Sequence, residues 1–167
     1  MASKPMWMVR AGEDAQYIGD FKKRSMVAIG WGATGPLLRG TSREELTKCV
    51  NQAWPEYKKN KLANATGQIY RFINQIAVGD WVITYDPPRR VYLVGKVVGD
   101  PAYEKDGNPQ LQHYREIAWG NEVSRDSLSP SSKNTLGAIL TLFLLSDSAR
   151  DETLKLAKGS VWDETGS

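Results

Sequence analysis

The sequence predicts one α+β domain built on a strongly bent, partly closed β-sheet. Three observations favour this class: β-rich runs near the N-terminus, two helical segments after them, and further β-rich runs before a last helix. A chain of 167 residues has room for one domain with a substantial core. Hydrophobic residues make up 41% and charged residues 25%, a balance that excludes disorder of the whole chain.

Two strands are expected first. Residues 6–10 place Trp7 and Val9 on one side of a strand and Met8 and Arg10 on the other. Residues 26–31 are apolar on both faces, so we expect this strand in the middle of the sheet. The polar residues 11–25 connect the two strands, and the glycine-rich residues 30–36 form the loop that follows.

Two helices are expected next. The first opens at residues 41–42, where Ser42 and Glu45 fit a capping box, and it ends at Trp54 and Pro55. The second runs from about residue 61 to residue 75. Its apolar face consists of Leu62, Ala65, Ile69, Phe72, Ile73 and Ile76.

The C-terminal half of the chain returns to strands. Residues 81–85 and 91–98 form a hairpin whose tip, 86–90, carries two prolines and two arginines. Residues 100–112 are expected as a loop, and residues 114–119 and 123–128 as further strands. A last helix is expected to open at Ser131 or Ser132 and to turn five apolar side chains toward a core: Leu136, Ile139, Leu140, Phe143 and Leu144. The predicted domain therefore spans residues 1–149, and residues 150–167 are expected as a polar linker or tail.

The composition argues against an enzyme, a metal centre or a bound cofactor. The chain has one cysteine and one histidine, too few for a disulfide, a cysteine-based zinc site or a histidine-rich metal centre. The single histidine, His113, has no nucleophile elbow nearby. No glycine-rich phosphate loop is present, and Glu56 and Lys58 follow a helix and a proline rather than lying on a strand beside a second acid.

The charge permits a nucleic-acid partner without requiring one, because the formal net charge is +3. No apolar run reaches the roughly 18 residues of a membrane span, and the first residues lack the apolar core of a signal peptide. We therefore expect a cytoplasmic protein with no membrane partner.

Recognition of a base outside a duplex needs aromatic planes, a few polar groups and a basic rim. Trp31 lies at a strand end between two glycines, which favours a stacking surface and a core position equally. Tyr85 and Asp86 lie at the mouth of the hairpin, where Asp86 either accepts a hydrogen bond from a base or caps the turn. Tyr17 either covers such a pocket or packs beneath it.

Polar and basic residues complete this candidate site. Asn64, Gln68 and Arg71 share one face of the second helix, which is either an enclosed polar surface or an exposed one. Arg89 and Arg90 at the hairpin tip either reach phosphates or protect the hairpin edge. Residues 58–61 are read more simply as a solvated loop between the helices.

Several short motifs resemble those of Mrr-like restriction endonuclease proteins. They are Met6 to Gly12, Val27 to Trp31, Lys61 to Ala65, Tyr70 to Phe72, Tyr85 to Pro87, Tyr92 to Gly95, Ser124 to Ser129 and Asn134 to Gly137. The resemblance covers about residues 6–146. In that family this segment precedes a separate catalytic nuclease domain, so the resemblance implies no enzymatic activity for this chain.

The layout is more distantly similar to the PUA-like superfamily, which includes the EVE, YTH, ASCH and SRA domains. This resemblance implies a bent, partly closed β-barrel with flanking helices that binds nucleic acid. In EVE domains the helix and strand end that correspond to 64–72 and 84–86 line the base pocket, and Trp31 falls where YTH domains place a cage aromatic. The resemblance implies pocket roles for Asn64, Gln68, Arg71, Tyr85 and Asp86. The predicted base pocket consists of Trp31, Tyr85, Asp86, Asn64, Gln68 and Tyr17.

The sequence thus predicts the specificity module of a restriction or phage-defence system, reading a modified DNA base that is flipped into an aromatic pocket. The residues expected to contact phosphates are Arg10, Arg39, Arg71, Arg89 and Arg90. The expected partners are DNA and a nuclease domain or effector subunit. Two alternatives stay open: an RNA-binding PUA-like module, and a sensor domain that binds a ligand or a protein within a defence complex.

Overall fold

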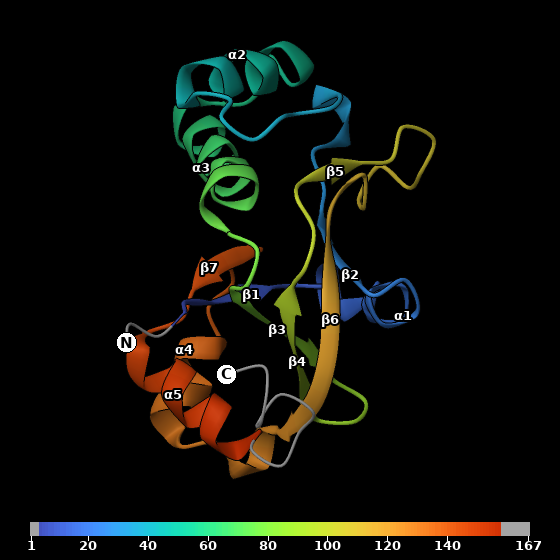
Figure 1. The fold of residues 1–167 in the computed structure, drawn as a ribbon. Helices are drawn as coiled ribbons and strands as arrows, with labels where there is room; N and C mark the ends of the chain where they lie inside the picture. The colour runs from blue at the N-terminus through green and yellow to red at the C-terminus, as the bar shows by residue number, and fades with distance from the viewer. Residues whose placement is uncertain (1–3, 158–167) are drawn as a thin grey trace.

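The computed structural model describes residues 4–157 and shows a mixed α+β fold on a curled, half-barrel sheet (Figure 1). The strands are β1 (Met6–Val9), β2 (Met26–Ile29), β3 (Trp81–Asp86), β4 (Val91–Val97), β5 (Ala102–Tyr103), β6 (His113–Ser124) and β7 (Leu142–Leu144). Their order is β2-β6-β4-β3-β1-β7, and β5 pairs with β6. β2 stands at the end of this order, whereas the sequence predicted it in the middle of the sheet. It nevertheless contacts β1, which is compatible with a partly closed barrel.

Five α-helices flank the sheet: α1 (Ile18–Lys23), α2 (Arg43–Ala53), α3 (Lys59–Tyr70), α4 (Pro130–Leu136) and α5 (Asp147–Leu156). α2 and α3 lie together at one end of the molecule, and α4 and α5 lie at the opposite end (Figure 1). A π-helical turn, Arg71–Gln75, continues α3, and short 3-10 turns occupy Glu13–Ala15, Gly32–Thr34 and Arg125–Ser127.

The core is divided between the two ends. The larger cluster joins β2 and the inward side chains of β1 and β6 to α2, α3 and the π-helical turn. The smaller cluster joins β3 and β4 to α4 and α5. The long strand β6 pairs with β2, β4 and β5, so it carries the connection between the two parts of the sheet.

The curl of the sheet has a local cause where β4 meets β6. The register shifts between Leu93 and Gly95. A Cβ atom on Gly95 would lie 2.5 Å from Cγ2 of Ile117 and 2.7 Å from the carbonyl oxygen of Ala118. Only glycine therefore allows β4 and β6 to approach this closely at the irregularity.

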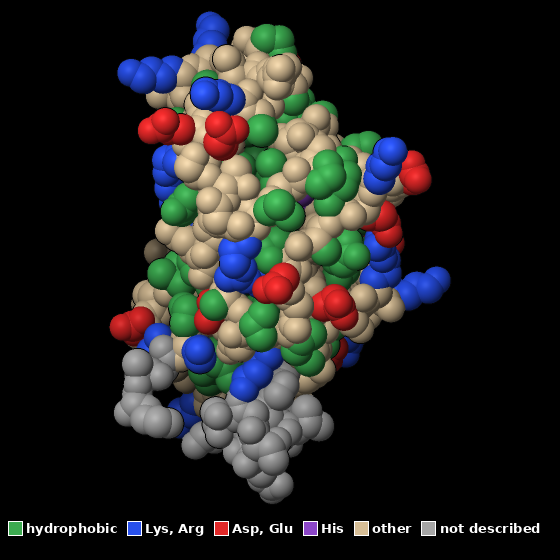
Figure 2. Space-filling view, turned by 45° about the horizontal axis from the view of Figure 1, so that its top comes forward, with side chains coloured by type: hydrophobic (Ala, Val, Ile, Leu, Met, Phe, Trp, Pro, Cys, Tyr) green, Lys and Arg blue, Asp and Glu red, His purple; other side chains and the backbone are tan. Residues whose placement is uncertain are grey.

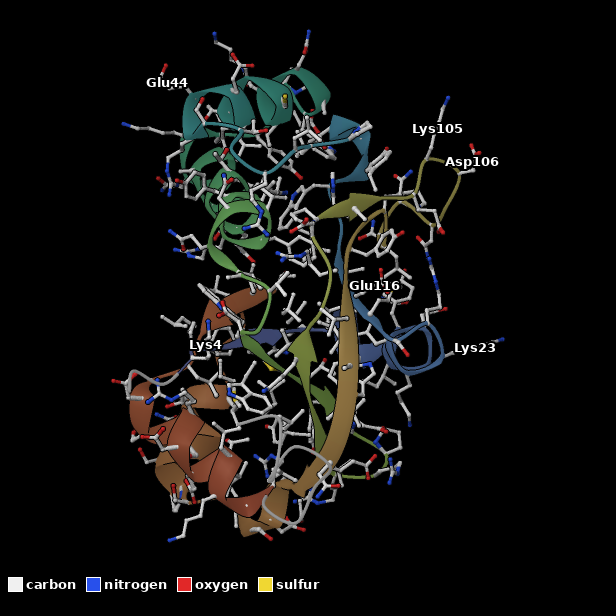
Figure 3. All side chains as sticks on the ribbon, in the orientation of Figure 1. Lys4, Lys23, Glu44, Lys105, Asp106 and Glu116 are labelled. Atoms are coloured by element: carbon white, nitrogen blue, oxygen red, sulfur yellow. The ribbon has the colours of Figure 1, made fainter. Side chains whose placement is uncertain are left out.

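The predicted start of α2 is confirmed, whereas α4 is capped by Ser129 and not by Ser131 or Ser132. The Ser42 hydroxyl accepts a hydrogen bond from the Glu45 amide at 3.1 Å and caps α2, as expected. α3 begins at Lys59, two residues before the predicted start. The loop expected over 100–112 contains the short strand β5, and Figure 3 shows Lys105 and Asp106 pointing outward from the loop beyond it.

Two predictions for the C-terminal part were wrong. β6 runs without a break to Ser124, so residues 125–127 form a 3-10 turn instead of extending a strand over 123–128. The helix expected to reach residue 144 ends at Leu136, and Leu142–Leu144 forms β7 on the edge of β1. The apolar spacing suited a helix, but the free edge of β1 pairs with residues 142–144, and Leu142 is buried there with its amide bonded to Oε1 of Gln68. Ile139, which the prediction placed against a core, is 90% exposed.

The predicted boundary at residue 149 lies inside α5, which packs against α4. The Glu152 carboxylate accepts hydrogen bonds from the hydroxyls of Ser132 and Ser129, and at 2.8 Å from the Ser129 amide. These bonds lower the pKa of Glu152. Residues 150–157 thus belong to the fold, and the rest of the predicted tail lies outside the described residues.

One buried cation joins the helical end to the sheet. Arg115 on β6 is fully buried, and its Nη1 donates to the carbonyl oxygens of Phe72 at 2.8 Å and Ile76 at 2.7 Å. Its Nε donates to the Gly99 carbonyl at 2.9 Å. Burial lowers the pKa of Arg115 to about 10, so the side chain remains a cation at neutral pH.

Replacing Arg115 by methionine should lower the free energy of unfolding by about 2–4 kcal/mol. The change leaves three carbonyl groups without this donor, and each buried unsatisfied group costs about 1–3 kcal/mol, part of which is recovered because a charge is no longer buried. Urea denaturation measures the effect. Arg39→Met, which removes a surface ion pair, is the control and should change stability little. Equal effects of the two substitutions would contradict this role of Arg115.

Candidate functional site

A cleft of about 610 Å³ opens where β2 ends, between the Glu13–Ala15 turn and the connection from α2 to α3. This volume is in the range of roughly 300–1,000 Å³ that is typical of small-ligand sites. The residues that line it come from five separate segments: Arg10, Gly12, Glu13, Asp14, Tyr17, Ala28, Ile29, Gly30, Trp31, Trp54, Tyr57, Gln110, Ile139 and Thr141.

Four aromatic side chains line the cleft: Tyr17, Trp31, Trp54 and Tyr57. All four are half-buried against the larger core cluster. Trp54 and Tyr57 are stacked, with ring centroids 5.6 Å apart and planes inclined by 12°. The cleft therefore presents flat apolar surfaces of the kind that bind a planar guest.

The backbone of Trp31 is in the left-handed region, with φ 63° and ψ 32°. This conformation is unusual for a bulky side chain and costs on the order of 1–3 kcal/mol. Residues that keep such strain occur often at binding sites, where the surrounding structure enforces it. The strain is the strongest local sign that the position of the Trp31 ring has a function.

Side chains on β5 and β6 hold the turn that carries Trp31. His113 Nε2 lies 3.2 Å from the Trp31 carbonyl oxygen and 3.0 Å from the Thr34 hydroxyl. The Tyr103 hydroxyl donates to the Gly32 carbonyl at 2.8 Å. Burial lowers the pKa of His113, so its ring is neutral at pH 7 and can donate one hydrogen bond to the Trp31 carbonyl.

The charged residues of the cleft are Arg10, Glu13 and Asp14. The Arg10 guanidinium donates to the carbonyl oxygen of Ala138, from Nε at 3.2 Å and also from Nη2. Glu13 and Asp14 are exposed, and neither forms an ion pair with another residue in the described range. Acidic groups therefore outnumber basic ones on the wall of the cleft.

The polar stripe on α3 does not line this cleft. Gln68 is 2% exposed, and its Oε1 accepts from the Leu142 amide at 3.0 Å. Its Nε2 donates to Oδ1 of Asn64 at 3.2 Å, while Asn64 itself is exposed. Gln68 thus satisfies the backbone of β7, a structural use for the enclosed polar surface that the sequence suggested. Arg71 is half-buried and does not line the cleft either.

The residues at the hairpin mouth are also absent from the cleft lining. Asp86 is 3% exposed and forms ion pairs with Lys22 at 3.1 Å and with Arg89 at 3.9 Å. Tyr85 packs on Tyr92, with ring centroids 4.6 Å apart. Of the six residues predicted for the base pocket, the cleft contains Trp31 and Tyr17 but not Asn64, Gln68, Tyr85 or Asp86.

Three of the predicted phosphate-binding residues are paired with acids. Arg39 binds Asp100 at 3.0 Å, Arg89 binds Glu122 through both terminal nitrogens, and Arg90 binds Asp126. The bonds from Arg90 lower the pKa of Asp126. Figure 2 likewise shows basic side chains interspersed with acidic ones on the face it presents.

Cations without such partners lie beside the cleft. A shallow hollow along the connection between α2 and α3 is lined by residues 56–61, and Tyr57 lines both this hollow and the cleft. Lys58 and Lys59 form no ion pair with any described residue. The Lys61 ammonium lies 4.6 Å from the centroid of the Tyr57 ring. The sequence prediction treats these lysines as a solvated loop and gives Trp54 and Tyr57 no part in a binding site. The signal that could have identified the two residues is the spacing of two aromatic side chains three positions apart.

Neither a metal centre nor a membrane span is found in the part of the chain that the structure describes. Between residues 4 and 157, no group of three or more His, Cys, Asp or Glu side chains is arranged to hold a metal ion. None of the helices in the same range combines the length and the apolar character that crossing a bilayer requires.

The fold and the cleft define a small α+β domain with an aromatic-lined cleft at the end of a strand. The chain belongs to DUF8426, a family described as a domain of unknown function, whose family model matches residues 7–145. No curated protein matches the chain, and no solved structure does.

Acidification should destabilise the protein through His113. Burial lowers the pKa of His113 in the folded state. The unfolded chain therefore binds more protons than the folded protein as the pH falls through about 6.5, the ordinary pKa of histidine. The free energy of unfolding should therefore fall between pH 7 and pH ~5.5, and His113→Gln should remove most of this slope. Urea titrations at a series of pH values test it, and identical slopes in the two proteins would contradict the assignment.

Proposed function

We propose that this domain is a nucleic-acid-binding specificity module, not a catalytic one, and that it reads a modified base extruded into the cleft at Trp31. The observation that carries the proposal is the strained Trp31 backbone at a cleft lined by four aromatic rings. A base that leaves a stack loses a few kcal/mol, and stacking on aromatic side chains returns about 1–3 kcal/mol for each base.

Polar groups in the cleft would read the edge of the base. Gln110 supplies an amide, and Arg10, Glu13 and Asp14 supply charged groups on the same wall. This set replaces Asn64, Gln68 and Asp86, whose polar atoms bond within the protein or lie outside the cleft. The choice of base would then depend on Arg10, Glu13, Asp14 and Gln110, which line the cleft.

The biological setting of the proposal comes from resemblance. A curled, partly closed sheet with flanking helices is compatible with the PUA-like class, several members of which hold modified bases. The resemblance to the segment that precedes the nuclease in Mrr-like proteins suggests a restriction or phage-defence system. We therefore propose DNA as the principal partner and a nuclease domain or effector subunit as the second.

Trp31→Ala should abolish the preference for a modified base while weak binding to any duplex persists. The substitution removes stacking but leaves the cations that bind phosphates. Fluorescence anisotropy with one duplex, unmodified or carrying a single modified base, measures both affinities. Trp31→Phe, which keeps a ring in the same place, should retain most of the preference.

Three outcomes of such binding titrations would contradict the proposal. Equal loss of specific and non-specific binding in folded Trp31→Ala protein would mean that the cleft does not hold the base. Failure of the unchanged protein to bind any nucleic acid at low salt would favour a ligand or protein sensor. Tighter binding to a matched RNA would instead indicate an RNA-binding module through the 2′-hydroxyl.

The double substitution Lys58→Gln/Lys59→Gln should weaken binding to all duplexes about equally. Removing one cation that neutralises a phosphate reduces the slope of log affinity against log salt by about 0.9, so the slope should flatten by about two. Arg89→Gln, which removes a cation already paired with Glu122, is the control and should alter the slope less. A larger effect of Arg89→Gln would place the phosphates at the hairpin tip instead.

A further inference from the structure

The charge on the wall of the cleft is opposite to that expected for a site that binds a polyanion. Two carboxylates, Glu13 and Asp14, line it together with one guanidinium, that of Arg10. The chain as a whole carries a formal charge of +3. Carboxylates in a base-binding cleft repel phosphates and attract positive charge, so they favour a guest that is itself a cation.

The carboxylates are available to such a guest. Neither Glu13 nor Asp14 forms an ion pair with any other residue between 4 and 157. The Asp14 backbone is itself in the left-handed region, with φ 53°, which an aspartate adopts more readily than most residues but not without cost. Both acids belong to the short turn that also leads to Tyr17.

Like the carboxylates, the aromatic rings of the cleft favour a cationic guest. The face of an aromatic ring is the negative pole of its quadrupole and attracts a positive charge within about 6 Å of the centroid. Tyr57 already has the Lys61 ammonium at 4.6 Å on one of its faces. Trp54 stacks on Tyr57, and Trp31 and Tyr17 provide further rings from other segments of the wall.

We propose that the guest of the cleft is a positively charged, N-methylated base, of which 7-methylguanine is the representative. The inference rests on the proposed function and specifies the chemical class of the base. The rings stack on the planar cation, and the carboxylates of Glu13 and Asp14 lie beside its charge. The arrangement combines π faces with acids, which is the chemistry used to bind methylated ammonium groups.

The experiment compares two duplexes that differ only in this charge. One carries 7-methylguanine, a cation, and the other carries 7-methyl-7-deazaguanine, which has the same shape and methyl group but no charge. Anisotropy titrations should show at least about tenfold tighter binding to the cationic duplex, a difference that one desolvated cation–π contact is strong enough to produce.

The double substitution Glu13→Gln/Asp14→Asn tests the origin of the preference. It removes both charges at nearly constant shape, and asparagine tolerates positive φ well at position 14. The roughly tenfold preference for the cationic duplex over the neutral one should fall to about twofold or less. Glu44→Gln on α2 is the control, because Glu44 points away from the molecule (Figure 3) and does not line the cleft.

The outcomes separate this inference from the proposed function. Equal affinity for the two duplexes, tightest binding to a neutral modified base, or a preference that survives Glu13→Gln/Asp14→Asn would overturn the cationic guest. In each of these cases a loss of modified-base preference in Trp31→Ala would leave the proposed function standing. If Trp31→Ala changes nothing in any duplex, the proposed function itself fails.

Discussion

The fold depends on the inward face of β6, where a guanidinium and an imidazole replace the apolar side chains of an ordinary core strand. Arg115 binds the carbonyls at the end of α3 and of the segment after β4, so the helical end cannot move away from the sheet without exposing a buried charge. His113, two residues earlier on the same face, holds the turn of Trp31. One strand thus fixes both the position of the helices and the geometry of the cleft.

This arrangement explains how a strained tryptophan can persist. The left-handed backbone at Trp31 is unfavourable alone, but the bonds from His113 and Tyr103 keep the turn in place. The connection between α2 and α3, anchored through Arg115 at the far end of α3, provides Trp54 and Tyr57 to the same cleft. A preformed cleft of this kind avoids the entropy cost of ordering aromatic side chains when a guest binds.

Much of the fold was predictable because its signals are local. Runs of β-forming residues identified β1, β3 and β4, and the Ser42 cap identified the start of α2. The β7 strand was not predictable in this way, because Leu136, Ile139 and Leu140 repeat at helical spacing, and only the free edge of β1 makes residues 142–144 extended. α5 was missed because its polar sequence conceals the few side chains that it buries, such as Thr153.

The candidate site was predictable only in part, for a related reason. Trp31 was found from its place at a strand end between glycines and Tyr17 from the loop after the first strand, whereas Trp54 was interpreted only as the end of a helix. Gln68 was assigned to a pocket because its partner, the Leu142 amide, lies 74 positions away in the sequence. Whether a polar side chain remains free to bind a ligand depends on partners far away in the sequence, and a local sequence pattern does not reveal those partners.

The most direct test of a base in the cleft is the NMR signal of each tryptophan indole as a modified duplex is added. We expect large shifts for Trp31 and Trp54, whose rings line the cleft. We expect little change for Trp7 and Trp119, whose indole N–H groups bond to Asp80 and to the Phe21 carbonyl inside the protein. Shifts confined to other residues, with the Trp31 and Trp54 signals unmoved at saturation, would contradict a base in the cleft.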